Sequence, residues 1–302
     1  MRFITATALA ALIAGPALAE GWQEDYQVIR FGILSGENEK DRISRYTPFE
    51  QYLEAELGVE VEIFTAGNYD GVIQAMAADQ VEFAFFGSSS YAAAYTAMNG
   101  GVEPLLSRLQ NDGSTGYFSV IVTRCDSGLD DLASLEGKTL AFADPDSTSG
   151  FAVPFFNLVN VEGINPREYF SAIPFSGSHE GGVQGVINGT FEAAATWERN
   201  ETDGIVARMV TKEMVEAGQV CTIWKSPEIT SGPFTARANL PAELKQDMKQ
   251  AVMDIVEKEP AAFKEMTGGA DSTQKDWIEV DHSRYQWIVD MRQWIREERR
   301  GS

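Results

Sequence analysis

The sequence predicts an α/β protein that is divided into two lobes. Strand-like and helix-like segments alternate along the chain: Val28–Leu34 and Val59–Thr65 have the apolar patterns of strands, and Tyr46–Leu57 between them has one apolar helical face. Such alternation is typical of parallel sheets whose strands are joined by crossover helices. The pattern restarts near residue 122, which indicates a second α/β lobe.

In the first lobe, two further strand–helix pairs follow in order. A predicted helix over Tyr69–Ala78 leads to a short buried strand, Phe83–Phe86, that ends at Gly87. Serines then open an alanine-rich helix, because a Ser hydroxyl caps the unpaired N–H groups of a helix start. A strand over Tyr117–Thr123 completes this part of the chain.

The second lobe repeats the alternation on a smaller scale, and helices close the chain. We expect, in order, a helix over Leu132–Leu135, a strand over Thr139–Ala143, a helix over Phe151–Val161, a helix over Val183–Asn188, strands over Phe191–Thr196 and Cys221–Trp224, and final helices over Pro241–Lys258 and Ser283–Arg300.

The chain is expected to cross between the lobes twice, around Val120–Thr123 and around Ser226–Phe234. This places residues 20–121 and 233–302 in the first lobe and residues 122–232 in the second. Two crossing strands form the hinge of a clamp that closes on a ligand. Ligands of such sheets bind at the carboxyl ends of the strands.

The first nineteen residues have the pattern of a secretory signal peptide. Arg2 is followed by the apolar stretch Phe3–Ala14, and Ala17-Leu18-Ala19 provides a small-residue cleavage site that leaves Glu20 as the new N-terminus. The apolar stretch is short for a membrane anchor, and no later run reaches about 20 apolar residues. We therefore expect an exported, periplasmic protein without membrane insertion after cleavage.

Composition excludes several classes of function. The 302 residues contain 24 Lys and Arg against 45 Asp and Glu, a net charge of −21, and this balance argues against nucleic acid or anionic membranes as partners. Two cysteines and two histidines exclude a Cys-rich zinc module, and we expect neither a metal nor a cofactor. Hydrophobic residues at 44% predict a packed globular protein, which we expect to be a monomer.

The two cysteines have two interpretations. Cys125 follows a predicted strand and Cys221 precedes another, and an oxidising compartment permits a disulfide between them. The alternative, a reactive thiol, lacks a neighbouring His that would lower the thiol pKa.

Hydroxyl-rich loops at the strand ends carry the candidate site. Ser147, Thr148 and Ser149 lie between a predicted strand and a helix, where hydroxyl donors join the free N–H groups of a helix start to form an oxyanion site. The alternative is a simple helix cap. Trp197 and Glu198 end a strand and therefore lie at the expected ligand edge.

A second polar loop contains His179, which can donate to an oxyanion and whose pKa a bound anion would raise. Tyr69 and Tyr117 each follow a Gly-containing segment and could supply two more hydroxyl donors. For each of these residues the alternative is ordinary packing or a solvated loop.

Several segments together resemble the periplasmic phosphonate-binding proteins of ABC transporters. The segments are Asn68-Tyr69-Asp70-Gly71, Gly116–Val120, Asp144–Pro154, Ser178-His179-Glu180 and Ile223–Pro227. The resemblance implies a two-lobed type II periplasmic binding fold. It also implies that Tyr69, Tyr117, Ser147, Thr148, Ser149 and His179 hold the phosphonate oxygens, and that a membrane permease receives the ligand.

The sequence departs from this family where the ligand substituent is expected. Family members that take 2-aminoethylphosphonate place acidic residues at its ammonium group. Counting from His179 places Arg199 at the first of these positions, with Glu198 adjacent, and Thr230–Pro233 lacks the second acid. Glu198 or the ring of Trp197 could replace the acids by charge or by cation–π attraction, or Trp197 could reduce the pocket to fit a small ligand.

We therefore expect a binding protein that captures 2-aminoethylphosphonate or an alkylphosphonate without catalysis. Alternatives are a binder of phosphite, phosphate or another small oxyanion, an exported sensory or structural protein, and a hydrolase. A hydrolase is disfavoured because Gly87-Ser88-Ser89-Ser90-Tyr91 lacks the closing glycine of a nucleophile elbow, and His179-Glu180 is followed by no second His of a zinc motif.

Overall fold

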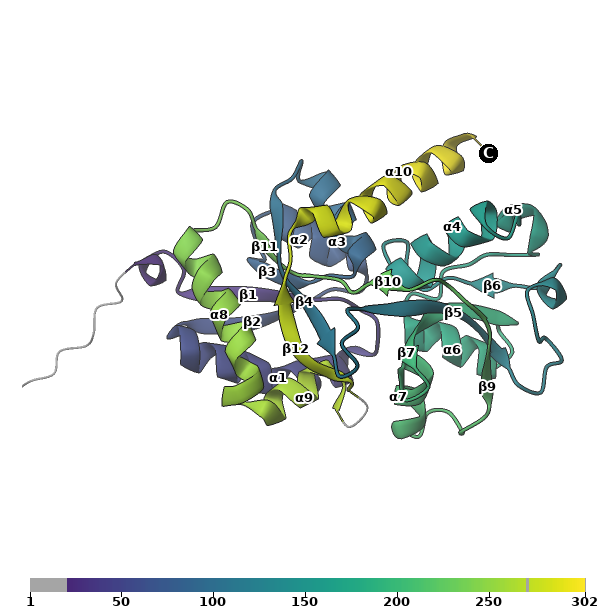
Figure 1. The fold of residues 1–302 in the computed structure, drawn as a ribbon, viewed down its shortest axis with the longest axis horizontal. Coiled ribbons are helices and arrows are strands. Elements are labelled where there is room, and N and C mark those ends of the chain that lie inside the picture. The colour runs from purple at the N-terminus through teal and green to yellow at the C-terminus, as the bar shows by residue number, and fades with distance from the viewer. Residues whose placement is uncertain (1–20, 270–271, 302) are drawn as a thin grey trace, which may run out of the picture.

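The computed structural model describes residues 21–269 and 272–301 and consists of two α/β lobes side by side (Figure 1). The expected signal peptide, residues 1–19, and Glu20 lie outside the described residues. Each lobe is built around one β-sheet, so the predicted two-lobed α/β class is confirmed. No helix in the described ranges has the length and apolar character needed to cross a membrane.

The first lobe contains a six-stranded sheet with the order β12-β4-β11-β3-β1-β2. Strands β1, β2 and β3 are parallel, whereas β11 is antiparallel to both β3 and β4, and β12 is antiparallel to β4. The strands are β1 (Val28–Ile33), β2 (Glu60–Thr65), β3 (Phe83–Phe85), β4 (Val102–Gln110), β11 (Phe234–Arg237) and β12 (Gln274–Glu279).

The second lobe contains a smaller sheet with the order β10-β5-β7-β6, to which β8 and β9 add at β7 and β5. β5 is antiparallel to β7 and β9, and β6 is parallel to β7. The strands are β5 (Gly116–Arg124), β6 (Leu140–Ala141), β7 (Ala193–Asn200), β8 (Asp203–Gly204), β9 (Val220–Lys225) and β10 (Ile229–Thr230).

Helices cover both faces of the first sheet and flank the second (Figure 1). Because side chains alternate along a strand, Phe31 packs with α1, α8 and α9 on one face, and Ala84 packs with α2, α3 and α10 on the other. The helices are α1 (Glu39–Leu57), α2 (Tyr69–Ala77), α3 (Ser88–Ala97), α4 (Val153–Asn160), α5 (Pro166–Tyr169), α6 (His179–Ile187), α7 (Ile205–Thr211), α8 (Ala242–Lys258), α9 (Pro260–Thr267) and α10 (Gln286–Gly301), with the π-helical turn η3 (Thr148–Ala152) and short 3₁₀ turns at Trp22–Glu24, Ala133–Leu135 and His282–Tyr285.

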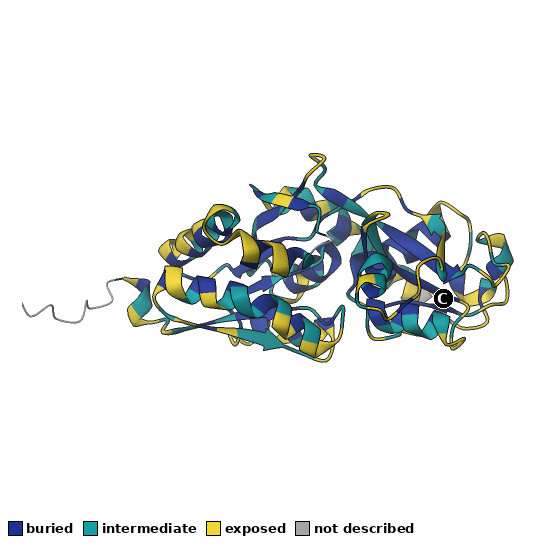
Figure 2. Cartoon of the chain, turned by 90° about the horizontal axis from the view of Figure 1, so that it is seen from below, coloured by how far each residue is buried: buried dark blue, intermediate teal, exposed yellow. Residues whose placement is uncertain are grey.

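Burial of apolar side chains stabilises each lobe separately. The buried residues form a dark layer along the strands of both lobes, and the exposed residues lie on the outer faces of the helices (Figure 2). The ring of Phe31 lies 5.4 Å from that of Phe49 of α1, and Phe83 stacks on Phe234 at 5.6 Å. Each buried ring of this size contributes about 1.5–3 kcal/mol relative to exposure.

The chain changes sheets at two places. β5 pairs with β7 from Phe118 to Thr123, so it belongs to the second sheet over its whole length. The first change therefore falls between Gln110 and Gly116, earlier than the expected Val120–Thr123, and the return falls at 231–233, between β10 and β11. The expected lobe limits, 20–121 with 233–302 and 122–232, stay a prediction.

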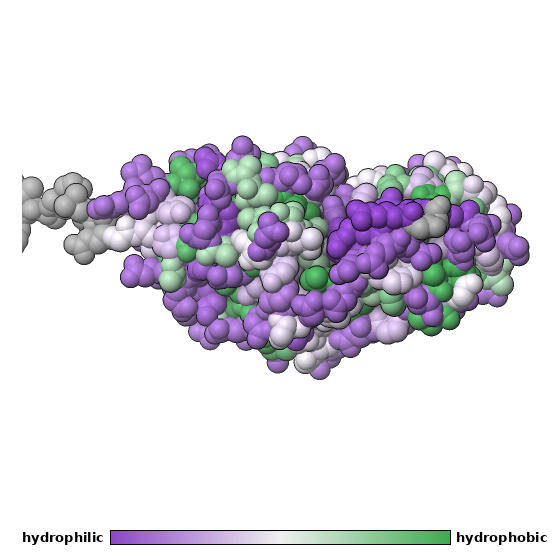
Figure 3. Space-filling model, turned by 90° about the horizontal axis from the view of Figure 1, so that it is seen from above, coloured by the Kyte–Doolittle hydropathy of each residue, from purple (hydrophilic) through white to green (hydrophobic). Residues whose placement is uncertain are grey.

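The C-terminal helix α10 begins in the first lobe and extends over the second (Figure 1). The ring of Trp294 lies 5.0 Å from that of Phe156 of α4, and Arg292 forms an ion pair of 2.6 Å with Asp146. Seen from above, the arginine-rich outer side of α10 is a strongly hydrophilic ridge (Figure 3). The helix thus connects the two lobes on this side of the molecule.

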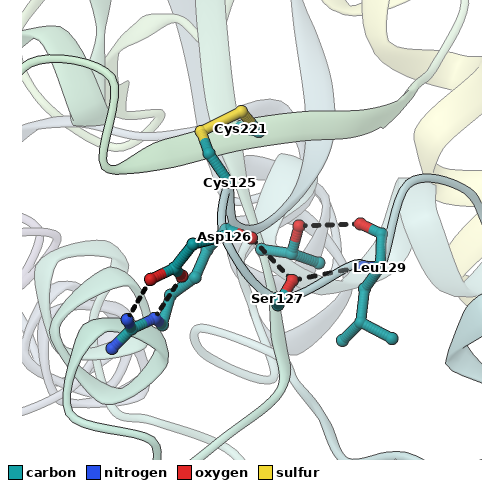
Figure 4. Close-up of a disulfide and its surroundings, with 7 residues drawn as sticks. Cys125, Asp126, Ser127, Leu129 and Cys221 are labelled. Atoms are coloured by element: carbon teal, nitrogen blue, oxygen red, sulfur yellow. Dashed lines mark hydrogen bonds and ion pairs between the residues drawn. A yellow bond between two sulfur atoms is a disulfide. The ribbon is translucent and has the colours of Figure 1, made fainter.

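Cys125 and Cys221 form a disulfide that joins the end of β5 to β9 (Figure 4). The two strands pair next to it, with Thr123 opposite Cys221, and the Cys125 N–H donates to the Gln219 carbonyl at 3.0 Å. The bond links residues 96 apart in the sequence. It therefore restricts the unfolded chain over most of the second lobe.

We predict that replacing both cysteines, Cys125→Ser with Cys221→Ser, lowers the free energy of unfolding by about 2–4 kcal/mol, because the unfolded chain regains the freedom of a long loop. Urea unfolding of the oxidised protein and the double variant measures the difference. Ligand affinity should not change, since neither cysteine lines the cavity described below. Equal unfolding midpoints would contradict a stabilising role.

Candidate functional site

A cavity of about 210 Å³ lies between the two lobes. Its walls come from loops that follow the carboxyl ends of strands, such as Leu34 and Gly36 after β1 and Phe86 and Gly87 after β3. This is the edge of an α/β sheet at which ligands bind. Seven of the eight predicted site residues line this cavity: Tyr69, Tyr117, Ser147, Thr148, Ser149, His179 and Trp197.

The hydroxyl loop Ser147-Thr148-Ser149 forms the second lobe's contribution. Each of the three side chains belongs to a residue that is only 2% exposed. Ser147 caps η3 by accepting a hydrogen bond of 3.0 Å from the Gly150 N–H. Gly150 has to be glycine, because a Cβ atom there would lie 2.5 Å from the Cβ of Ala143. The loop is therefore held tightly, and all three of its residues line the cavity.

His179 is the first residue of α6, whereas the sequence predicted a loop at this position. Its Nε2 lies 3.3 Å from the Ser147 hydroxyl, and its Nδ1 lies 3.1 Å from the Thr196 hydroxyl of β7. Burial lowers the pKa of His179 to about 4, because the interior disfavours the charged imidazolium. At neutral pH the ring is therefore uncharged and offers one donor and one acceptor.

Two tyrosines complete this part of the site. Tyr69 is the first residue of α2 in the first lobe, and its hydroxyl interacts with Ser147 of the second lobe. The Tyr117 hydroxyl of β5 interacts with the side chains of Thr148 and Ser149. Burial raises the pKa of both tyrosines above its usual value, so both hydroxyls keep their protons.

Four helical segments begin at the cavity wall. The first residues of α2, η3 and α6 line the cavity, and so does Gly87, the N-cap of α3. Helix starts carry free N–H groups and a partial positive charge, which favour a bound anion. Together with the hydroxyls and the neutral imidazole, they form an anion site that contains no formal charge.

Trp197, Glu198 and Arg199 all lie within β7, which extends to Asn200 rather than ending at Thr196. Successive side chains of a strand point to opposite faces. Trp197 and Arg199 accordingly line the cavity, whereas Glu198 does not. The Glu198 carboxylate accepts a hydrogen bond of 2.8 Å from Lys225 instead. The structure thus separates Glu198 from the other predicted site residues.

The ring of Trp197 contacts two cations of the protein itself. The guanidinium carbon of Arg199 lies 5.1 Å from the ring centroid, and that of Arg208 lies 4.7 Å from it. The alternative that Trp197 offers its face to a ligand ammonium is therefore disfavoured, because two guanidinium groups already occupy the neighbourhood of the ring.

Three arginines that the sequence did not indicate also line the cavity: Arg45, Arg108 and Arg208. They come from α1, β4 and α7, and no local motif connects them. Neither β4 nor α7 is among the elements that the sequence predicts. In the part of the chain that the structure describes, no group of three or more His, Cys, Asp or Glu residues is placed to hold a metal ion.

Comparison with known proteins decides the family. The sequence profile described as "ABC transporter, phosphonate, periplasmic substrate-binding protein" matches residues 31–285, which is most of the chain. The chain belongs to this family.

Two relatives align with most of this chain and with two thirds or more of their own length. The phosphonates-binding periplasmic protein of Escherichia coli K12 is 32% identical over 80% of this chain and 68% of its own length. The phosphate-import protein PhnD of Mycolicibacterium smegmatis is 30% identical over 82% of this chain and 80% of its own length.

Solved structures agree with the fold. A binding protein component of an ABC phosphonate transporter from Pseudomonas aeruginosa has a TM-score of 0.77 and 27% identity, over 88% of this chain and 85% of that one. PhnD1 from Prochlorococcus marinus, in complex with methylphosphonate, has a TM-score of 0.76 and 20% identity, over 89% of this chain and 98% of that one.

We predict that the His179 imidazole of the ligand-free protein titrates near pH 4 and that its pKa rises when a phosphonate binds. Burial disfavours the imidazolium, and a neighbouring anion favours it. Proton NMR of the two histidines measures both values, with His282→Gln to assign the signals.

The same shift predicts a pH dependence of stability. The pKa of His179 is lower in the folded than in the unfolded chain, so protonation of this ring favours the unfolded state. The full free energy of unfolding is therefore present above about pH 6.5, and part of it is lost as the pH falls towards 4. Urea unfolding of wild type and His179→Gln should show a shallower pH dependence for the variant in this window. A midpoint near 6.5 that a phosphonate leaves unchanged would contradict the placement of His179.

We also predict that Glu198→Gln leaves the affinity for methylphosphonate and for 2-aminoethylphosphonate unchanged, because the Glu198 carboxylate pairs with Lys225 outside the cavity. Calorimetric titration with both compounds measures this. A selective loss for the amino compound would restore Glu198 to the role that the sequence suggests.

Proposed function

We propose that the chain captures a phosphonate in the interlobe cavity, in the periplasm, and delivers it to the permease of an ABC importer. One observation carries the proposal: Ser147, Thr148, Ser149 and His179 are buried together and line the same cavity. Family membership and the name of the Escherichia coli relative support a phosphonate, whereas the Mycolicibacterium smegmatis relative is named a phosphate-import protein.

The mechanism of binding is replacement of water by fixed neutral donors. A phosphonate has three oxygens on phosphorus, and it loses their hydration when it enters a cavity closed by two lobes. Hydroxyls, the imidazole N–H and helix N-termini restore these hydrogen bonds. Bonds to a charged acceptor contribute more than bonds between neutral groups, about 1.5–3 kcal/mol each. The proposal includes no bond-making step, as in the family as a whole, whose members bind and deliver.

Contacts between the lobes couple binding to closure. The Ser89 N–H of the first lobe donates to the Thr148 hydroxyl at 2.8 Å, and the Tyr69 N–H donates to Asp144 at 3.2 Å. One partner in each contact, Thr148 or Tyr69, also lines the cavity. A ligand that fixes Thr148 and Tyr69 therefore favours the closed arrangement, which is the form that a permease would recognise.

The size of the cavity favours a phosphonate over phosphite or phosphate. The volume of about 210 Å³ is several times the ~30 Å³ that one water molecule occupies in the liquid. An inorganic ion bound at the hydroxyl loop would leave much of this space unfilled, whereas a substituent on phosphorus would fill it.

We predict that Ser147→Ala combined with Thr148→Ala weakens methylphosphonate binding at least about 100-fold, because two hydrogen bonds to a charged ligand are lost. Calorimetric titration of refolded, ligand-free protein measures the affinity. Ser171→Ala is the matched control, since this exposed serine of the second lobe has one long contact of 3.4 Å, to Thr139. Affinity that survives in the double variant would place the anion elsewhere, provided that circular dichroism shows a folded protein.

A further inference from the structure

Four arginines surround one part of the cavity: Arg45, Arg108, Arg199 and Arg208, here called the arginine cluster. The lining includes one carboxylate, Glu37, and the imidazole of His179, which is neutral. The wall of the cavity is therefore positively charged, although the chain as a whole has a net charge of −21. A low-dielectric cleft concentrates such a local field.

Two carboxylates compensate part of this charge. Arg199 and Arg208 share Asp203, at 3.2 and 3.3 Å, and Arg45 forms an ion pair with Glu37. The side chain of Asp203 is 1% exposed and does not line the cavity. Asp203 thus serves two guanidinium groups, and Glu37 serves both Arg45 and Lys212, so neither carboxylate neutralises its partners fully.

Arg108 has no carboxylate within ion-pair distance among residues 21–269 and 272–301. Its one hydrogen bond to a described residue goes to the neutral Oε1 of Gln274, at 2.9 Å. Burial first, and then the neighbouring charges of Arg199 and, more weakly, Arg208 and Arg45, lower the pKa of Arg108 to about 10. A cation held among other cations is unfavourable unless an anion accompanies it.

The arginine cluster adjoins the hydroxyl loop. The Tyr117 ring lies 5.9 Å from the guanidinium carbon of Arg199, while its hydroxyl interacts with Thr148 and Ser149. Aromatic rings hold two further guanidinium groups, since Arg208 packs on Trp197 and Arg45 packs on Tyr46 at 4.7 Å each. The cavity thus has a neutral anion site and, beside it, an orientated cationic one.

We propose that the arginine cluster is a second anion subsite, and that the ligand is a phosphonate or phosphate ester whose substituent ends in a carboxylate. The inference rests on the proposed function, which places phosphorus at Ser147–Ser149. Arg108 would donate to the carboxylate, and Arg199 would assist it. An ammonium at the same place would face four guanidinium groups, so the subsite rejects 2-aminoethylphosphonate.

The test compares ligands with matched linkers. 3-Phosphonopropionate and 2-aminoethylphosphonate both have two methylenes after phosphorus but end in opposite charges. Methylphosphonate has no terminal group, and phosphoglycolate tests a phosphate ester. The full chain is expressed, purified from the periplasm, freed of ligand by unfolding and refolded with its disulfide intact. It is titrated calorimetrically at about pH 9, because alkylphosphonates lose their second proton at a higher pH than phosphate esters, whose second pKa is about 6, and all four phosphorus groups are then largely doubly charged.

We expect 3-phosphonopropionate or phosphoglycolate to bind at least about tenfold tighter than methylphosphonate, and 2-aminoethylphosphonate to bind more weakly than methylphosphonate. Arg108→Gln should remove the preference for the carboxylate, so that it weakens 3-phosphonopropionate binding at least about tenfold more than methylphosphonate binding. The melting temperature of the ligand-free variant should not fall, because the substitution removes an uncompensated cation. The matched control is Arg30→Gln, because the Arg30 side chain lies outside the cavity, is 42% exposed and pairs with Glu62.

Failure of the subsite and failure of the proposed function give different results. Methylphosphonate binding without preference for either carboxylate, or an unchanged preference in Arg108→Gln, would overturn the subsite alone. Binding of none of the four compounds would overturn the proposed function together with it. If Arg108→Gln does not fold, the wild-type comparison and Arg108→Lys, which keeps the charge and should keep the preference, decide the question.

Discussion

The structure depends on one constraint: an anion has to be held inside a protein that is itself strongly acidic, with a net charge of −21. Long-range attraction cannot supply the binding energy, because salt screens distant charges beyond about 8 Å. Short, fixed donors have to do so instead. In the proposed site Ser147, Thr148, Ser149 and His179 supply them, and burial that keeps His179 neutral also keeps this part of the cavity free of formal charge.

The same constraint explains why the site is divided between lobes. Donors from one lobe alone leave an anion open to water, whereas Tyr69 and the start of α3 close over the hydroxyl loop from the first lobe. The ligand completes contacts that already join the two halves, so recognition and closure share one set of residues. The cationic wall beside them changes what the site can select, because a substituent is then chosen by its charge as well as by its size.

Features of the fold and site that depend on neighbouring residues could be predicted from the sequence. Features that depend on pairing between distant segments could not. Alternating segments indicated the α/β lobes, and the hydroxyl loop was recognisable because its residues are adjacent in sequence. Glu198 lies apart from the other predicted site residues because β7 continues beyond Thr196, and in a strand Glu198 faces the side opposite to Trp197 and Arg199. Arg108 was missed because β4 mixes polar and apolar residues, and only its pairing with β11 and β12 makes it a strand.

The most direct test of the account is a crystal structure of the protein with 3-phosphonopropionate. The account predicts closed lobes, with the phosphorus-bound oxygens within hydrogen-bonding distance of Ser147, Thr148 and Ser149, and with the carboxylate on Arg108. A reversed ligand, with phosphorus on the arginine cluster and the carboxylate on the hydroxyls, would contradict the assignment of the two subsites. A ligand outside the cavity would contradict the account as a whole.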